Sequence, residues 1–508
     1  MNHHLVKLLV LIAALAAMLA FAGAVAAMPN DLEFSSDIRV QNIEGEPANI
    51  VISFYDLDGD GTSVHQLHDT IEGYGDRYYF TIQYPLGENW SGSAVVGADR
   101  EIRVINNLYT EDWAYQGASN GYLSGAYEIG LPLIQLSNKD WDTWFNVQNV
   151  GPDPARVWVV FEPGLAGKSY TTEEITLEPF VAYTFDQRDM TTQLLGPSPV
   201  GSDPEGKAFI GAATVYSEGS PVVATVVEGS EAQLMVYDGF IDVGTEDILV
   251  APLYHTNHNT TVSSIHVQNR GDVATTVTIN YVPSTSVPDS GKACYETYTI
   301  EPGAMKVFGL YAFHPAWGVN SPNSNCYTKN GMNRFVGSAY IDQDTGNSAH
   351  QLLVAEVQEF TPATGTGSAY NAIGPENAAP VLSFPEILDR NNGVWTSINL
   401  FNASDTDPED ITIYYHGRIQ NGVGDIVTVE QHLTLQPLES TNILHAQSTS
   451  PFAFALGNGW VGSALLVADD GDAKLVAVTN KLAPDAGDAL STYNAFPIWD
   501  LPAVAAGD

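Results

Sequence analysis

Internal repetition is the feature that most limits how this chain can fold. A short string recurs as Val-Gln-Asn at residues 40–42, 147–149 and 267–269, and as Leu-Phe-Asn at 400–402. A second string, an aromatic residue two places before a glycine and then small residues, follows each copy, and its glycines are Gly92, Gly211, Gly337 and Gly462. The spacings of these glycines, 119, 126 and 125 residues, indicate one structural unit used four times.

Within each unit the apolar residues alternate with polar ones, as in Val277–Tyr281 and Ile411–Tyr415. Alternation with a period of two, bounded by Gly, Pro, Asn and Asp, is typical of half-buried antiparallel strands. Several short strands in a little over a hundred residues predict an all-β chain of tandem immunoglobulin-like β-sandwich domains. The predicted units are 28–130, 131–248, 249–378 with loop insertions, and 379–508 with a short C-terminal tail.

The aromatic residue before the repeated glycine stands at the same place in all four units. A side chain repeated at one position favours a core residue over a platform for a ligand, since a binding site is seldom needed four times. The same interpretation applies to Trp141 and Trp395, which begin the predicted second strand of two units. The four aromatic residues before the glycines are Trp90, Phe209, Phe335 and Trp460.

The first 27 residues predict a secretory signal peptide. Lys7 precedes an apolar run of 16 residues, Leu8–Gly23, and Ala24–Ala26 forms a small-x-small cleavage site. The alternative is an uncleaved anchor helix, but the run is shorter than the roughly 20 residues that span a bilayer. No later segment is long and apolar enough to cross a membrane. We therefore expect a secreted or cell-surface protein with no transmembrane segment in its mature chain.

The chain has two cysteines, Cys294 and Cys326. In an oxidising compartment an isolated pair predicts a disulfide bond. The alternative, a reactive or metal-binding pair, lacks further ligands at a recognisable spacing.

The charge balance excludes several classes of partner. The chain has 60 acidic and only 19 basic residues in 508, which gives a formal net charge of −41. A nucleic-acid-binding protein needs a basic face to meet phosphates, and anionic lipid surfaces attract basic segments. Neither class fits, whereas divalent cations are a kind of partner that the acidic surface attracts.

The units resemble the tandem Ig-like or fibronectin-like repeats of uncharacterised exported bacterial proteins, which share a Trp-x-Thr-x-Ile-x-Val-Gln-Asn strand. This chain shows that strand as Trp141–Asn149 and, one residue shorter, as Trp395–Asn402, while the first and third units lack the tryptophan. The resemblance implies fold and export, and it implies no catalytic residue.

A calcium site is predicted from alternating aspartates in the first unit. Asp56, Asp58 and Asp60 place carboxylate oxygens around one point, which suits Ca²⁺. The twelfth position of an EF-hand loop counted from Asp56 is Leu67, so the full motif is not met. The alternative is a solvated hairpin turn, and calcium is in either case a possible rather than a required cofactor.

The third unit is the first candidate for a ligand-binding site. It is enlarged by insertions at 283–293 and 313–332, and long loops often bind partners. Tyr311, Trp317 and Tyr327 are the predicted ligand-binding residues, since exposed aromatic rings stack on sugar faces. The alternative is local packing of the insertions.

No catalytic residues are predicted. The chain has neither a Gly-x-Ser-x-Gly elbow nor a phosphate-binding glycine loop, and paired carboxylates arise by chance among so many acids. We expect a non-enzymatic structural or adhesive protein that is elongated and binds extracellular proteins, glycans or copies of itself. The alternative is a carbohydrate- or ligand-binding protein that uses the third unit, and the minor alternative is a secreted hydrolase, which would need an acidic pair facing a groove.

Overall fold

The computed structural model describes residues 34–87, 90–110, 113–241, 248–258, 260–314, 323–344, 350–361, 365–374, 377–446, 452–483, 488 and 490–499, with the backbone of strand β1 at 16–19. Most of the predicted signal peptide, the C-terminal tail and Trp317 lie outside these residues. Within the described part, no helix has the length and apolar character needed to cross a membrane.

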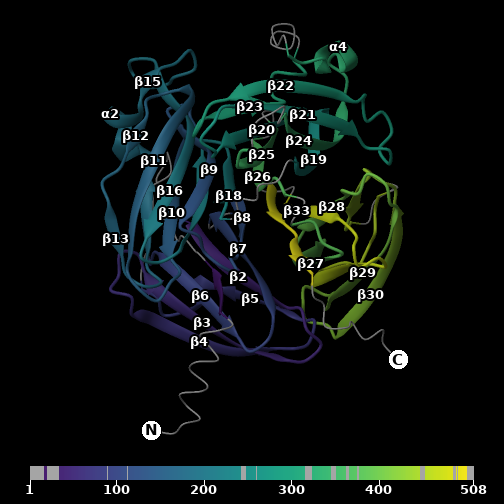
Figure 1. Cartoon of the computed structure of the whole chain (residues 1–508). Coiled ribbons are helices and arrows are strands. Elements are labelled where there is room, and N and C mark those ends of the chain that lie inside the picture. Colours follow the sequence, from purple (N-terminus) through teal and green to yellow (C-terminus); the bar gives the residue numbers. More distant parts are fainter. Residues whose placement is uncertain are drawn as a thin grey trace.

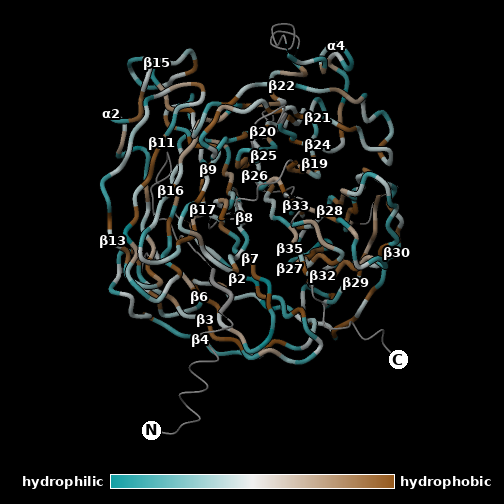
Figure 2. Tube along the Cα trace, viewed as in Figure 1, coloured by the Kyte–Doolittle hydropathy of each residue, from teal (hydrophilic) through white to brown (hydrophobic). Residues whose placement is uncertain are grey.

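The predicted all-β architecture is confirmed: antiparallel strands make up most of the chain (Figure 1). The sequence alternation becomes an alternation of burial. In β29 (Glu409–Arg418), Ile411, Ile413 and Tyr415 are buried while the residues between them are half-buried. Figure 2 shows the same pattern as changes between brown and teal along the strands. Burying one face of each strand drives paired sheets to enclose a core.

The first two groups of strands are two-sheet sandwiches, each around its own apolar core. The sheets of the first sandwich have the orders β1-β6-β3-β4 and β5-β2-β7-β8, those of the second β14-β10-β17-β18 and β12-β11-β16-β15, with β9 on β16 and β13 on β11. The first contains β1 (Ala16–Leu19), β2 (Phe34–Asn42), β3 (Ala48–Asp56), β4 (Ser63–Ile71), β5 (Asp76–Phe80), η1 (Thr81–Gln83), β6 (Gly92–Ala98), β7 (Ile102–Thr110) and β8 (Gln116–Asn120). The second contains β9 (Glu128–Leu136), β10 (Asp142–Asn149), β11 (Ala155–Ala166), β12 (Tyr170–Thr171), β13 (Ile175–Leu177), β14 (Ala182–Asp186), η2 (Gln187–Met190), α2 (Thr191–Leu194), β15 (Gly196–Pro197), β16 (Lys207–Glu218), β17 (Val222–Gly229) and β18 (Leu234–Asp238).

The third sandwich is one continuous sheet, because β19 pairs with both β24 and β20, whereas the fourth again has two sheets. Each encloses an apolar core. The third contains β19 (Ile248–His258), β20 (Thr261–Asn269), β21 (Thr275–Pro283), β22 (Cys294–Ile300), β23 (Met305–Phe308), α4 (Cys326–Asn330), β24 (Phe335–Asp344), β25 (Leu353–Thr361) and β26 (Thr366–Asn371). The fourth contains β27 (Val381–Asp389), β28 (Trp395–Asn402), β29, β30 (Ile426–Leu435), β31 (Ser440–Leu444), β32 (Trp460–Ala468), β33 (Leu475–Leu482), β34 (Leu490–Asn494) and β35 (Phe496–Ile498).

The repeated glycine lies where a neighbouring carbonyl takes the place of a side chain. A Cβ on Gly211 would lie 2.2 Å from the carbonyl oxygen of Glu162, and one on Gly337 would lie 2.0 Å from that of Val282. Gly92 and Gly462 meet carbonyl oxygens at 1.9 and 2.2 Å in the same way. Close approach of two strands therefore explains the repeated glycine. The aromatic residues Phe209, Phe335 and Trp460 are fully buried, as predicted for core residues, and Trp90 is half-buried against the first core.

The repeated asparagine joins two turns to a strand end. In the second sandwich the Asn149 Nδ2 group donates to the carbonyls of Asp153, at 2.8 Å, and Glu178, at 3.2 Å. Its Oδ1 atom accepts from the backbone N–H of Gly151 at 2.9 Å. The same three kinds of bond are made by Asn42, Asn269 and Asn402. The asparagine recurs in the repeated string because its buried amide makes the same hydrogen bonds in every unit.

The four sandwiches are arranged in a closed ring, not as the elongated string that the sequence predicted. One strand from each sandwich lies at the centre, where β8 contacts β18 and β34, and β26 contacts the same two strands (Figure 1). The first sandwich therefore touches both the second and the fourth. We call the four interfaces seams, and name each by the two sandwiches that it joins.

Four residues at the ends of these strands form a hydrogen-bonded circle: Asn120, Asp238, Asn371 and Asn494. The Nδ2 groups of Asn120, Asn494 and Asn371 each donate, at 2.7 Å, to the backbone carbonyl of the next member, which is Asn494, Asn371 and Asp238 respectively. The backbone N–H groups donate back to the side-chain oxygens at 2.9–3.3 Å. In three sandwiches a tyrosine precedes the member of the circle, and Tyr237, Tyr370 and Tyr493 donate their hydroxyls to the carbonyls of Leu133, Leu253 and Glu386.

Candidate functional site

A cleft lies at the fourth–first seam. It has a volume of about 740 Å³, which falls in the usual range of about 300–1,000 Å³ for small-molecule sites. The first sandwich supplies a wall from β5 and the loop before β8, and the fourth supplies the hairpin after β27 and the turn after β29. Apolar clusters also join these two sandwiches, as in the contact of Ile105 with Tyr493 and Phe496, so the cleft occupies only part of the seam.

The floor of the cleft is a buried network of charges from both sandwiches. The Lys481 Nζ group donates to Asn107 Oδ1 at 2.7 Å and lies 3.3 Å from Glu386 Oε2. The Tyr78 hydroxyl donates to Glu386 Oε1 at 2.6 Å, and the Arg39 guanidinium lies over the Tyr78 ring at 3.9 Å. Asp76, Asp37 and Glu386 all line the cleft, and Asp76 pairs with Arg39 at 2.6 Å. Buried charges of both signs lie within pairing distance here, while Arg39 Nε has no hydrogen-bond partner.

Two carboxyls of this network differ in their tendency to ionise. Burial raises the pKa of Asp37 to about 7, an effect that Lys481 opposes and Glu386 reinforces. The pKa of Glu386 is lowered, because the attraction of Lys481 and Arg39 exceeds the opposing effect of burial. Asn107 Nδ2 donates to both carboxyls, at 3.0 Å to Asp37 and 3.4 Å to Glu386. At neutral pH one carboxyl of the pair is therefore ionised while the other can hold a proton.

Aromatic rings form part of the wall. Trp113 lines the cleft, is 43% exposed, and stacks on Tyr109 with ring centroids 4.1 Å apart. Its φ of 60° is a backbone conformation that a bulky residue rarely adopts. Tyr78 and Phe80 also line the cleft, stacked with centroids 5.8 Å apart. Such faces are suited to contact the ring of a ligand.

The charged residues of the floor depart from the repeat. Asp37 lies three residues before the repeated Val-Gln-Asn string, where the other units have Trp144, Ser264 and Ser397. Arg39 lies one residue before it, where the others have Asn146, His266 and Asn399. Structural positions recur in all four units, whereas these side chains occur once and meet in one cleft.

Lys481 is the most informative departure, because its position can be compared at every seam. It pairs across the sheet with Ser491, three residues before Asn494 of the central circle. The corresponding residues of the first, second and third sandwiches are Leu108, Glu228 and Glu359. Glu228 accepts from Gln358 at 3.0 Å and Glu359 accepts from Asn480 at 3.1 Å, so each reaches an amide of the next sandwich as Lys481 does.

The predicted calcium ligands are held by separate partners. Asp56 accepts from the indole of Trp90 at 2.9 Å, and Asp60 accepts from the backbone N–H of Thr62 at 2.9 Å. Asp58 adopts a φ of 53°, and its backbone N–H donates to a carbonyl of the second sandwich. Among the residues that the structure describes, no group of three His, Cys, Asp or Glu could hold a metal ion. Calcium binding at these aspartates stays a prediction.

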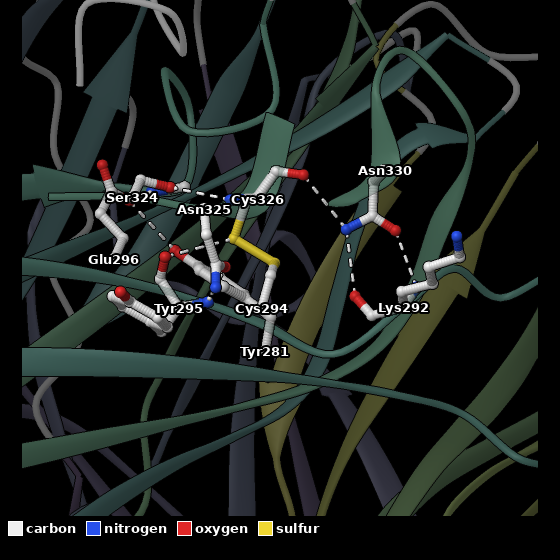
Figure 3. The surroundings of a disulfide bond; sticks show 10 residues. Tyr281, Lys292, Cys294, Tyr295, Glu296, Ser324, Asn325, Cys326 and Asn330 are labelled. Carbon is white, nitrogen blue, oxygen red and sulfur yellow. Dashed lines mark hydrogen bonds between the residues drawn. A yellow bond between two sulfur atoms is a disulfide. The ribbon is translucent and has the colours of Figure 1, made fainter. Parts of the chain in front are cut away.

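The third sandwich confirms the disulfide prediction. Cys294 and Cys326 are buried and bonded, with Cα atoms 4.9 Å apart. Asn330 reinforces the link, since its Nδ2 group donates to the carbonyls of Lys292 and Cys326 (Figure 3). The bond therefore attaches both insertions to one sandwich.

Two of the aromatic residues predicted to bind a ligand, Tyr311 and Tyr327, do not line the cleft. Tyr311 and Tyr327 are half-buried, and burial raises the pKa of Tyr311. Trp317 lies outside the described residues. The cleft at the fourth–first seam was not predicted from the sequence, because the prediction relied on long loops. Asp37 and Arg39 nevertheless differ from the residues at the same positions of the other units, and this difference can be seen in the aligned repeats.

Comparisons with known proteins name no family for this chain. No protein-family model matches it, and no curated protein matches it either. Among solved structures, a glycoside hydrolase of family 32 from Bifidobacterium adolescentis aligns with 91% of this chain and 94% of its own, at 9% identity and a TM-score of 0.14. A TM-score this low carries no argument about fold or function.

Proposed function

We propose that this protein is a non-enzymatic extracellular binding protein that holds a carbohydrate in the fourth–first cleft. The observation that carries the proposal is the combination in one cleft of an exposed Trp113, stacked on Tyr109, with a floor of hydrogen-bonding groups. Sugars present an apolar ring face and a rim of hydroxyls, so they need an aromatic surface and several donors and acceptors at once. The cleft offers both.

The polar groups of the wall suit hydroxyl recognition. Gln116, Asn391, Asn392 and Asn421 line the cleft, and each amide can donate and accept. Arg77 and Arg418 stand at the rim, where they pair with Asp69 and Glu72 and are 48% and 35% exposed. Three of the chain's 19 basic residues, Arg77, Arg418 and Lys481, therefore line one cleft of a strongly acidic protein. This concentration supports a polar ligand that meets both signs of charge.

The proposed function retains the adhesive role that the sequence suggested, but it places the binding site at the fourth–first seam. An adhesive role at a cell surface is compatible with a glycan-binding cleft, whereas a spacer role needs an extended shape. The third sandwich supplies a disulfide, which is compatible with an oxidising location outside the cell. The site proposed is the seam in place of the insertions around Tyr311 and Trp317.

Binding to a glycan array, followed by calorimetry with the glycans that bind, tests the proposal. We expect Trp113→Ala to weaken binding by about tenfold or more, since base- or sugar-stacking aromatics typically contribute over 1 kcal/mol. Trp499→Ala is the matched control, because Trp499 is 54% exposed and lies outside the cleft. Equal binding by both variants and the parent protein would place the site elsewhere, and the absence of binding to any glycan would refute the proposed ligand class.

Hydrolysis is the second candidate function, because Asp37 and Glu386 meet the requirement of an acidic pair at a groove. The two carboxyls share the Asn107 amide and differ in ionisation, as an acid and a nucleophile or base would. Release of reducing ends from a bound glycan, lost in Glu386→Gln, would favour hydrolysis over binding alone. If no reducing ends are released after prolonged incubation, hydrolysis is excluded as the function.

A further inference from the structure

The central circle contains one acid among three amides, and that acid lacks one hydrogen bond. Each asparagine makes two bonds to one neighbour: its Oδ1 accepts from the backbone N–H, and its Nδ2 donates to the backbone carbonyl. Asp238 makes the first of these bonds to Asn120, with Oδ2 accepting from the N–H at 2.9 Å. Its other oxygen, Oδ1, is buried without a partner.

The position of Oδ1 follows from the symmetry of the circle. In the three asparagines the corresponding atom is Nδ2, which lies 2.7 Å from the carbonyl oxygen of the next member. At Asp238 two acceptors, Oδ1 and the Asn120 carbonyl oxygen, would face each other across the first–second seam. A buried acceptor pair of this kind is unfavourable unless one of the two atoms carries a proton.

We propose that Asp238 is protonated in the folded protein and donates its Oδ1–H to the Asn120 carbonyl, so that the circle is complete and its closure depends on pH. The proton takes the place of the amide N–H that the other three members supply. Loss of the proton breaks the one bond of this type between the first and second sandwiches and buries a negative charge beside a carbonyl.

The surroundings of Asp238 favour the neutral form. Burial raises the pKa of its carboxyl to about 7, an effect that the hydrogen bond from the Asn120 N–H opposes. The neighbours are uncharged: Thr225 pairs with it across the sheet, and Asn120 and Asn371 flank it in the circle. Among the described residues, the titratable group that interacts with this carboxyl is the Tyr122 hydroxyl, which donates to the Ala224 and Gly239 carbonyls.

Thermal unfolding of the full chain at about pH 5 and about pH 9, on either side of the folded pKa, tests the proposal. The folded pKa exceeds the unfolded one, so this stabilisation is complete below about 4 and is lost as the pH rises through about 7. We expect Asp238→Asn, which supplies a permanent N–H, to raise the unfolding temperature at the higher pH by about 2–4 °C. At the lower pH, where the folded protein keeps the proton and the unfolded chain has mostly lost it, the gain should be smaller.

Two further variants separate the proposal from other effects of charge. Asp60→Asn removes an exposed carboxylate outside the circle and should leave the difference between the two pH values unchanged. Asn371→Asp puts a second acid in the circle and should lower the unfolding temperature mainly at the higher pH. The proposal would be overturned if the Asp238→Asn variant were less stable than the parent protein at the higher pH, or if its unfolding temperature were shifted equally at both pH values. An infrared difference spectrum between parent and variant that shows no loss of a protonated carboxyl would also overturn it.

Discussion

The first–second and fourth–first seams are built on corresponding positions but have opposite chemistry. At the first–second seam Leu108 packs in an apolar cluster with the fully buried Trp144 and with Val227. At the fourth–first seam the residue that corresponds to Leu108 is Lys481. Lys481 donates a hydrogen bond to Asn107, which occupies the position that Val227 has at the other seam. Apolar side chains can fill a seam, whereas paired charges need fixed geometry. At the fourth–first seam, buried charges at this position line a cleft, while apolar clusters hold the two sandwiches together elsewhere.

The two remaining seams are intermediate between these extremes. Glu228 and Glu359 occupy the same position and bond to amides of the next sandwich. Burial raises the pKa of each to about 8. They therefore act as neutral hydrogen-bonding groups near neutral pH, between an apolar leucine and a charged lysine.

The largest effect should come from Trp144→Ala at the apolar seam. Removing a fully buried tryptophan leaves a cavity between two sandwiches, and we expect a loss of about 3–5 kcal/mol in the free energy of unfolding. Denaturant titration measures it, with the exposed Trp499→Ala as control. A loss below about 1 kcal/mol, typical of surface sites, would show that this seam does not depend on apolar packing.

A smaller effect is expected from Lys481→Met at the charged seam. The variant keeps the length of the side chain but leaves Glu386 and Asp37 without its ammonium group. Arg39 still lies 3.8 Å from Glu386, so we expect a loss of about 1–3 kcal/mol.

Denaturant titration of Lys481→Met should be compared with that of Lys474→Met, which removes an exposed lysine from the same strand region. Equal stability of these two variants would contradict the view that Lys481 holds the fourth–first seam together.

The smallest effect is expected from Glu228→Gln at the second–third seam. At low pH the carboxyl is protonated in both the folded and the unfolded protein and resembles its amide, so there the change in stability should stay within about 0.5 kcal/mol. The folded pKa of Glu228 is raised to about 8, so its stabilisation is complete below the unfolded pKa and is lost as the pH rises through about 8. The variant should therefore become the more stable protein in thermal unfolding as the pH rises. A variant that loses stability at every pH would contradict a neutral, amide-like role for Glu228.

Part of the fold could be predicted because its causes are local. Alternation gave strands, and the repeated Gly462 predicted a close approach that the structure shows against the His416 carbonyl. The buried Trp460 followed from its repetition, and the Cys294–Cys326 bond followed from the absence of other cysteines. None of these inferences required knowledge of how the sandwiches are placed.

The ring and its cleft could not be predicted in that way. Asn120 and Asn494 are 374 residues apart and belong to units that look alike, so no local pattern shows that their amides meet. Likewise Asp37 and Lys481 interact only because the fourth sandwich returns to the first. Period-two burial acts within one unit, so the strands and their repetition could be read from the amino-acid sequence. The unrepeated side chains that face one another at a seam belong to different units, so their contacts follow only from the way the sandwiches are packed together.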